Sequence, residues 1–146
     1  MLIGFEARNS PILLNEDWEK IDALDSTIIK LRSYHCIPEN ISRVVDRNLS
    51  VILRPSSDGE MNAADRYFEM GEAITKLLDA GVPEILLLPD SEPNLHGRPM
   101  PPDYWNRVAT FFLLVDRQFG EHNRSGRLKY GTPPMALAQG EEAWLA

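Results

Sequence analysis

The stretch that decides the fold of this chain is Glu84-Ile-Leu-Leu-Leu-Pro-Asp-Ser-Glu-Pro-Asn-Leu95. Its four consecutive apolar residues, 85–88, show no period-two alternation, so a strand built from them would be covered on both faces. Strands of that kind are typical of parallel sheets. The side chains turn polar directly after Pro89. Because ligands bind at the carboxyl ends of parallel strands in α/β proteins, the stretch predicts a buried strand with a functional polar tip.

The same pattern of short apolar strand, polar tip and amphipathic helix recurs along the chain. Apolar runs predict strands at 2–5, 27–31, 50–53, 85–88 and 128–130. Helical spacing predicts helices at 15–24, 38–45, 63–79 and 101–120, and a further helix that begins at 141. Asn15 is the expected N-cap of the first helix, and Gly81 and Gly120 are expected to end the third and fourth. Each unit has about the size of a βαβ step.

Such a series of units builds either an open parallel α/β sheet or the wall of a (β/α)₈ barrel. Polar tips follow every strand, as in a barrel, and the chain contains neither a G-x-G-x-x-G run nor a P-loop. We therefore expect one domain over residues 1–146 that forms the first four to five βα units of a barrel, with an open parallel sheet as the alternative. A full barrel usually needs about 250 residues, so we expect a fragment or completion by another copy.

Charge and composition narrow the classes of partner. The net charge is −7 and the chain has no basic stripe, so we expect no nucleic-acid partner. No apolar run is long enough for a transmembrane helix, and no signal peptide is visible. We therefore expect a soluble protein without a membrane partner, and the sequence does not indicate its cellular compartment. The lone cysteine, Cys36, is expected to be buried and structural. His35 and His96 lack a metal-binding spacing, so we expect no metal and no other cofactor.

The residues after the fourth strand resemble a known family. Ser91-Glu92-Pro93-Asn94-Leu95, followed by Pro102-Asp103-Tyr104-Trp105, is similar to the fourth-strand region of clan A glycoside hydrolases, retaining (β/α)₈ enzymes whose signature there is Asn-Glu-Pro. Ile3-Gly-Phe5, Lys30-Leu-Arg32 and Lys129-Tyr-Gly-Thr-Pro-Pro134 resemble the same families more loosely. The resemblance covers nearly the whole chain as topology, but only the short motif is specific.

The resemblance implies that Glu92 is the general acid/base. The family's asparagine, which holds the substrate's 2-hydroxyl, corresponds to Ser91, whose hydroxyl offers one donor where an amide offers two. The family's nucleophile, a glutamate at the end of strand seven, is expected to be absent from this chain. Retaining hydrolysis needs two carboxyl groups about 5 to 5.5 Å apart, and inverting hydrolysis about 6.5 to 9.5 Å. Asp58, in an inverting arrangement, and Asp90 are the nearby candidates for the second carboxylate.

Two functions stay open. The first is the N-terminal half of a glycosidase, with Glu92 as acid/base and the other polar tips lining a carbohydrate pocket. These tips are Arg8, Arg32, Tyr34, His35, Arg54, Asp58, Ser91 and Asn94. The second is a non-catalytic half-barrel that self-associates or binds a partner or a carbohydrate. Half a barrel exposes two sheet edges and an unfilled interior, so both hypotheses predict a homo-oligomer or a missing C-terminal half.

Several of these residues have a structural interpretation as well. Arg32 and Arg54 end buried strands, where a guanidinium equally fits an ion pair with Glu6, Asp58 or Glu92. Aromatic side chains near the tips favour burial over stacking on a sugar. These side chains are Tyr34, Tyr104, Trp105 and Trp144.

Overall fold

The computed structural model describes residues 4–57, 62–90 and 102–132, which form an α/β fold around one five-stranded parallel sheet. The strands are β1 (Gly4–Glu6), β2 (Ile28–Arg32), β3 (Ser50–Arg54), β4 (Ile85–Leu87) and β5 (Leu128–Tyr130). The helices are α1 (Asn15–Ala23), the short 3₁₀ helix η1 (Ser33–His35), α2 (Pro38–Asp46), α3 (Ala63–Asp79) and α4 (Tyr104–Arg124). The predicted α/β class with parallel strands is confirmed. The alternative of an open parallel sheet is consistent with the described strands.

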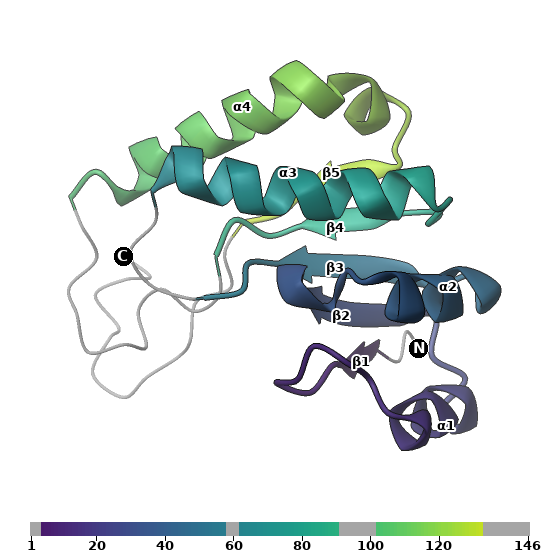
Figure 1. Ribbon diagram of the computed structural model, residues 1–146. Helices are drawn as coiled ribbons and strands as arrows, with labels where there is room; N and C mark the ends of the chain where they lie inside the picture. The colour runs from purple at the N-terminus through teal and green to yellow at the C-terminus, as the bar shows by residue number, and fades with distance from the viewer. Residues whose placement is uncertain (1–3, 58–61, 91–101, 133–146) are drawn as a thin grey trace, which may run out of the picture.

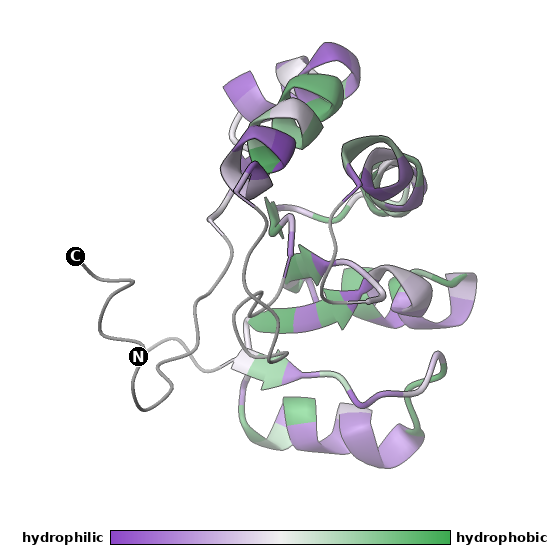
Figure 2. Cartoon of the chain, turned by 90° about the vertical axis from the view of Figure 1, so that its left-hand side faces the viewer, coloured by the Kyte–Doolittle hydropathy of each residue, from purple (hydrophilic) through white to green (hydrophobic). Residues whose placement is uncertain are grey.

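The strands lie side by side in chain order, β1-β2-β3-β4-β5, and every neighbouring pair is parallel. A right-handed crossover after each strand places successive helices on the same side of a sheet with this order. Figures 1 and 2 show this arrangement, with the helices following the sheet from α1 beside β1 to α4 beside β5. All the strand tips therefore meet at one edge of the sheet.

The face of the sheet under the helices forms the core. Ile29, Val51, Ile85 and Leu128 stand in register across four strands, and each is at most 1% exposed. They pack in one apolar cluster with residues of the two long helices. These residues include Met70, Ile74 and Leu77 from α3 and Tyr104, Phe111 and Val115 from α4. The core thus explains why α3 and α4 carry the longest apolar stripes.

The opposite face of the sheet is only partly covered. Glu6, Lys30, Ile52, Leu86 and Lys129 stand in register across it, and none of them is buried. No helix of the described segments covers this row. The prediction that both faces of the fourth strand are covered is therefore wrong for Leu86, because the helices lie on one side only.

Helix ends follow the predictions in part. Gly81 has φ +90° and ends α3, as its lack of a Cβ allows. The N-cap of α1 is Leu14 rather than Asn15, because the Asp17 carboxylate accepts the Leu14 N–H at 2.9 Å. Gly120 does not end α4, which continues to Arg124. The predicted helix from 141 lies outside the described residues.

Candidate functional site

The candidate site is the edge of the sheet where the strand tips meet. Of the residues predicted there, the structure describes Arg8, Arg32, Tyr34, His35 and Arg54. The remaining predicted residues, Asp58, Ser91, Glu92 and Asn94, lie outside the described residues. The geometry of the edge is therefore built from the first five side chains and from the groups that contact them.

Arg54 ends β3 and forms an ion pair with Glu6 at the end of β1. Arg54 Nη2 lies 2.6 Å from Glu6 Oε1, and Lys30 Nζ of the intervening strand lies 3.4 Å from the same oxygen. Arg54 is 8% exposed, whereas the Glu6 side chain is 54% exposed. Of the three ion-pair partners considered for Arg54, the structure shows Glu6, while Asp58 and Glu92 lie outside the described residues. The result is one carboxylate shared by two cations on the sheet face without helices.

Arg32 ties the tip of β2 to the tip of β3. Its Nη1 donates to the carbonyl oxygens of Pro55 at 3.4 Å and Ser56 at 3.0 Å. Hydrogen bonds from a charged donor to backbone carbonyls are among the stronger ones in proteins. This contact therefore holds two neighbouring tips at a fixed spacing.

His35 is a buried residue whose ring links two backbone segments by hydrogen bonds. Its ring is 1% exposed, Nδ1 accepts the N–H of Arg32 at 2.9 Å, and Nε2 lies 2.7 Å from the carbonyl oxygen of Arg8. These partners assign the proton to Nε2, which donates to that carbonyl. Burial lowers the pKa of His35, so the neutral ring is favoured. The structure gives His35 a positioning role in place of the predicted sugar contact.

Arg8 points back to α1. Its guanidinium contacts Asp17 through two nitrogens, each at 2.7 Å, and Glu16 at 2.7 Å. Burial raises the pKa of Asp17, but hydrogen bonds from Arg8 and from the Leu14 N–H outweigh it and hold that pKa below its ordinary value. Arg8 therefore anchors the loop after β1 to α1, which differs from the predicted substrate contact.

Asp90, the predicted alternative second carboxylate, is an anchor between the β4 tip and α4. It is 0% exposed and accepts a hydrogen bond of 3.1 Å from the Tyr104 hydroxyl. Burial, followed by the charge of Asp90, raises the pKa of Tyr104, so the phenol stays protonated as the donor. A fully buried carboxylate cannot meet an anomeric carbon that arrives from solvent. Asp90 is thus unsuited to act as nucleophile in this arrangement.

The sequence analysis missed two charged residues of α3 that fix the tips. Glu69 Oε1 accepts from the Ser33 hydroxyl and from the Ser56 N–H at 2.5 Å, while Arg66 Nη1 donates to the Ser57 carbonyl at 2.9 Å. Burial raises the pKa of Glu69, yet these hydrogen bonds bring it below its ordinary value. The available signal was Arg66, a charged residue four positions before Met70 on the core-facing stripe of the helix.

Among residues 4–57, 62–90 and 102–132 no three His, Cys, Asp or Glu side chains gather closely enough to hold a metal ion. None of the helices in those ranges combines the length and the apolar character that crossing a bilayer requires.

Chemically, the edge offers charged donors and acceptors close together. Glu6 can accept hydrogen bonds from hydroxyl groups, and the ammonium of Lys30 and the guanidinium of Arg54 can donate them. Comparison of the chain with protein-family models, curated proteins and solved structures gives no match.

Proposed function

We propose that this chain is the N-terminal part of a glycoside-hydrolase-like (β/α)₈ barrel that binds a carbohydrate at the edge where the strand tips meet. Glu92 is the general acid/base, and the nucleophile comes from outside residues 1–146. One observation carries the proposal. The fourth strand of the sheet ends at the edge that holds Glu6 and Arg54, and Ser91-Glu92-Pro93 follows this strand in the sequence. In a parallel α/β protein that edge is where ligands bind.

The strand order supports the barrel part of the proposal. Doubly wound sheets reverse their strand order at a switch point, whereas a barrel wall keeps chain order throughout. The order β1-β2-β3-β4-β5 with helices on one side has no reversal. It is the arrangement that further βα units would extend toward closure.

The ion pairs of Glu6 with Lys30 and Arg54, on the sheet face without described helices, favour a ligand rich in hydroxyl groups. In a barrel this face would line the interior, and Glu6 and Lys30 lie at its rim with side chains 54% and 27% exposed. Charged groups that stay in contact with water exchange their hydration for ligand hydroxyls at modest cost. Arg54, held by Glu6, adds planar donors of fixed direction.

The test is hydrolysis of a panel of aryl α- and β-glycosides and natural disaccharides by three proteins: the unaltered chain, Glu92→Gln and Glu121→Gln. Glu121 is an exposed residue of α4 and serves as the matched control. Because the proposal takes the nucleophile from outside this chain, we expect the chain alone to show no turnover of disaccharides. Any turnover that is measured should fall about 10²- to 10⁴-fold in Glu92→Gln and not in Glu121→Gln, because a general acid matters most for poor leaving groups.

Binding is measured in parallel, because the proposal takes the nucleophile from outside this chain. Saturation-transfer NMR with the same glycosides should show binding that Glu6→Gln weakens. A chain that neither hydrolyses nor binds any glycoside of the panel would refute the proposal.

A second function, a non-catalytic half-barrel that self-associates, is favoured by a different observation. Ile52 and Leu86 lie at the centre of the sheet row that no described helix covers, and both are only half-buried. A second copy placed against this face would cover them and the edges of β1 and β5, which pair with no other described strand. Sedimentation velocity tests this: a dimer that Ile52→Asp dissociates supports it, and a monomer at all concentrations excludes it.

A further inference from the structure

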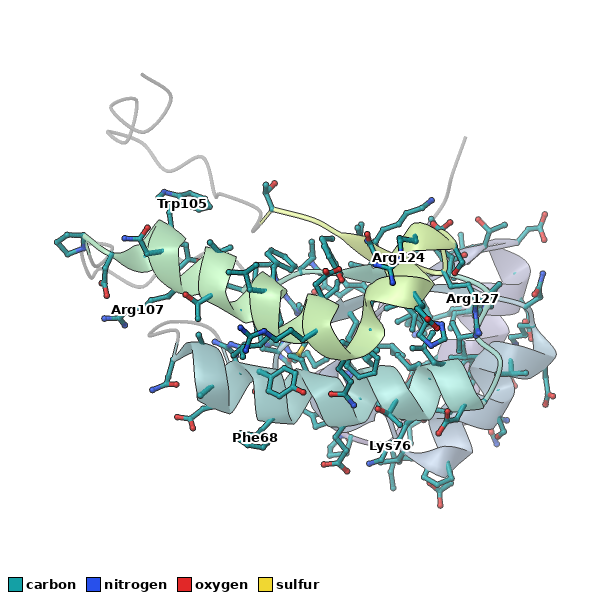
Figure 3. The ribbon with its side chains drawn as sticks, turned by 90° about the horizontal axis from the view of Figure 1, so that it is seen from above. Phe68, Lys76, Trp105, Arg107, Arg124 and Arg127 are labelled. Atoms are coloured by element: carbon teal, nitrogen blue, oxygen red, sulfur yellow. The ribbon has the colours of Figure 1, made fainter. Side chains whose placement is uncertain are left out.

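A cavity of about 340 Å³ lies on the helix side of the strand tips, between η1, the beginning of α2 and α3, and Tyr34 of the predicted tip residues is part of its lining. Its polar lining consists of Ser33, Tyr34, Ser56, Glu69, Glu72 and Lys76. Figure 3 shows Lys76 projecting from α3 on the side away from α4, so the cavity opens on the helix side of the sheet. The Glu6, Lys30 and Arg54 group stands on the opposite face.

We propose that this cavity is a binding site for a neutral, polyhydroxylated small molecule of about the size of a monosaccharide. The proposal goes beyond the function of the sheet edge, because neither Glu92 nor Glu6 takes part in it. The cavity volume lies at the lower end of the range of about 300–1,000 Å³ that is typical of small-molecule sites.

The charges around the cavity favour a neutral ligand. Glu69 Oε2 lies 3.6 Å from Arg66 Nη1, and Glu72 Oε1 lies 2.6 Å from Lys76 Nζ. Each carboxylate thus has a cation of the protein beside it. An anionic ligand would meet two carboxylates, and a cationic ligand would have to compete with Arg66 and Lys76. A ligand without charge disturbs neither pair.

The hydrogen-bonding groups favour hydroxyls on that ligand. A carboxylate has about four acceptor positions, and Glu69 uses Oε1 for the Ser33 hydroxyl and the Ser56 N–H. Its lowered pKa keeps it ionised and therefore acceptor-only. Ligand hydroxyls can donate to the remaining positions, and Glu72 at the rim adds a further acceptor.

The remaining wall is apolar and aromatic. Tyr34 is half-buried and packs against the buried His35 ring, with centroids 4.4 Å apart. Such a ring can pack on the C–H face of a sugar-like molecule. Cys36, Ile37 and Ala73 complete the wall. Burial raises the pKa of Cys36 to about 12, so the thiol stays neutral and acts as an apolar surface.

The experiment is ligand-observed NMR and calorimetry with glucose, galactose, mannose and N-acetylglucosamine, using n-butylamine and inorganic phosphate as charged probes. The unaltered chain should bind at least one sugar at millimolar concentration and neither charged probe. Tyr34→Ala should weaken that binding about tenfold through loss of the aromatic contact. Glu72→Gln should weaken it less, because that side chain is 71% exposed. Glu121→Gln, on α4, should leave it unchanged.

The edge variants separate this site from the proposed function. Sugar binding that survives Glu6→Gln and Glu92→Gln but is lost in Tyr34→Ala, with far-ultraviolet circular dichroism unchanged, assigns the ligand to the cavity. Binding that is lost in Glu6→Gln and kept in Tyr34→Ala would place the ligand at the sheet edge and overturn the cavity proposal alone. Preferential binding of n-butylamine or phosphate, or no binding of any sugar, would overturn it as well.

Discussion

The replacement of Asn40 tests how the strand tips are held. Asn40, in α2, is 1% exposed and makes three hydrogen bonds to backbone groups of two loops. Its Oδ1 accepts the Leu13 N–H at 3.2 Å, and its Nδ2 donates to the carbonyls of Pro11 at 2.7 Å and His35 at 2.9 Å. The amide thus fastens the loop after β1 to the tip of β2.

The cost of Asn40→Ala follows from these three bonds. Each buried hydrogen bond contributes about 1 kcal/mol net, and each buried group left without a partner costs about 1 to 3 kcal/mol. Because alanine leaves one N–H and two carbonyls without this partner, we expect a loss of about 3 kcal/mol in the free energy of unfolding. For a domain of this size that corresponds to a fall of about 6–12 °C in Tm.

Urea denaturation followed by circular dichroism measures this loss, with Asn106→Ala as the matched control. Asn106 is exposed on α4, so its replacement should change stability by less than about 0.5 kcal/mol. The variant Asn40→Asp tests the direction of the pH dependence of stability. An aspartate keeps the acceptor for Leu13 but, when ionised, faces two carbonyl oxygens, so its folded pKa should be raised. The penalty should then grow as the pH rises above about 4, the ordinary pKa of Asp. A cost of Asn40→Ala equal to that of Asn106→Ala would refute the reasoning.

Two further predictions concern buried polar groups. The pKa of His35 in the folded protein lies below the value of 6.5 in the unfolded chain. The contribution of His35 to stability is therefore fully present above pH 6.5 and is lost as the pH falls through the folded pKa. The free energy of unfolding, measured as a function of pH, should show this loss in the unaltered chain and not in His35→Gln. Tyr104→Phe removes the hydroxyl that donates to the fully buried Asp90 and should cost about 1 to 3 kcal/mol. The control is Trp105→Phe, because the neighbouring Trp105 side chain is 51% exposed and its replacement should cost less than about 1 kcal/mol. If thermal denaturation gave the same loss of stability for Tyr104→Phe and Trp105→Phe, the hydrogen bond to Asp90 would be contradicted.

The strands were predictable because their apolar runs are short and bounded by polar tips. β2, β3 and β5 begin within a residue of the predicted positions. The end of α4 was not predictable in this way, because a glycine such as Gly120 ends a helix only where the chain needs a left-handed turn. In the structure it is buried, and a Cβ there would lie 3.1 Å from Asp116 Oδ1 and from Arg124 Nη1. Both of these atoms belong to exposed side chains of the same helix, so Gly120 is an interior residue of α4 and does not act as its stop.

The polar tips were predictable as positions but not as roles. Loops that end parallel strands leave backbone N–H and C=O groups that need partners when they are buried. Arg32, His35 and Asn40 supply those partners, and Arg8 is engaged by α1. A polar residue after a strand therefore often satisfies backbone groups of the loop, and only the polar groups that are not engaged in this way are available to a ligand.

The pair of cations around Glu6 sets a condition on the proposed chemistry. Lys30 and Arg54 lie 3.4 Å and 2.6 Å from one Glu6 oxygen, and a further carboxylate beside these cations would be favoured in its ionised form. Such an environment suits a nucleophile. A general acid needs the opposite, a raised pKa that keeps its proton near neutral pH. Glu92 can therefore act as the acid only if the loop after β4 holds its carboxyl away from Lys30 and Arg54. An NMR titration of Glu92 decides between the roles: a pKa above about 4.3, the ordinary value for glutamate, fits the acid, and a lower pKa excludes it.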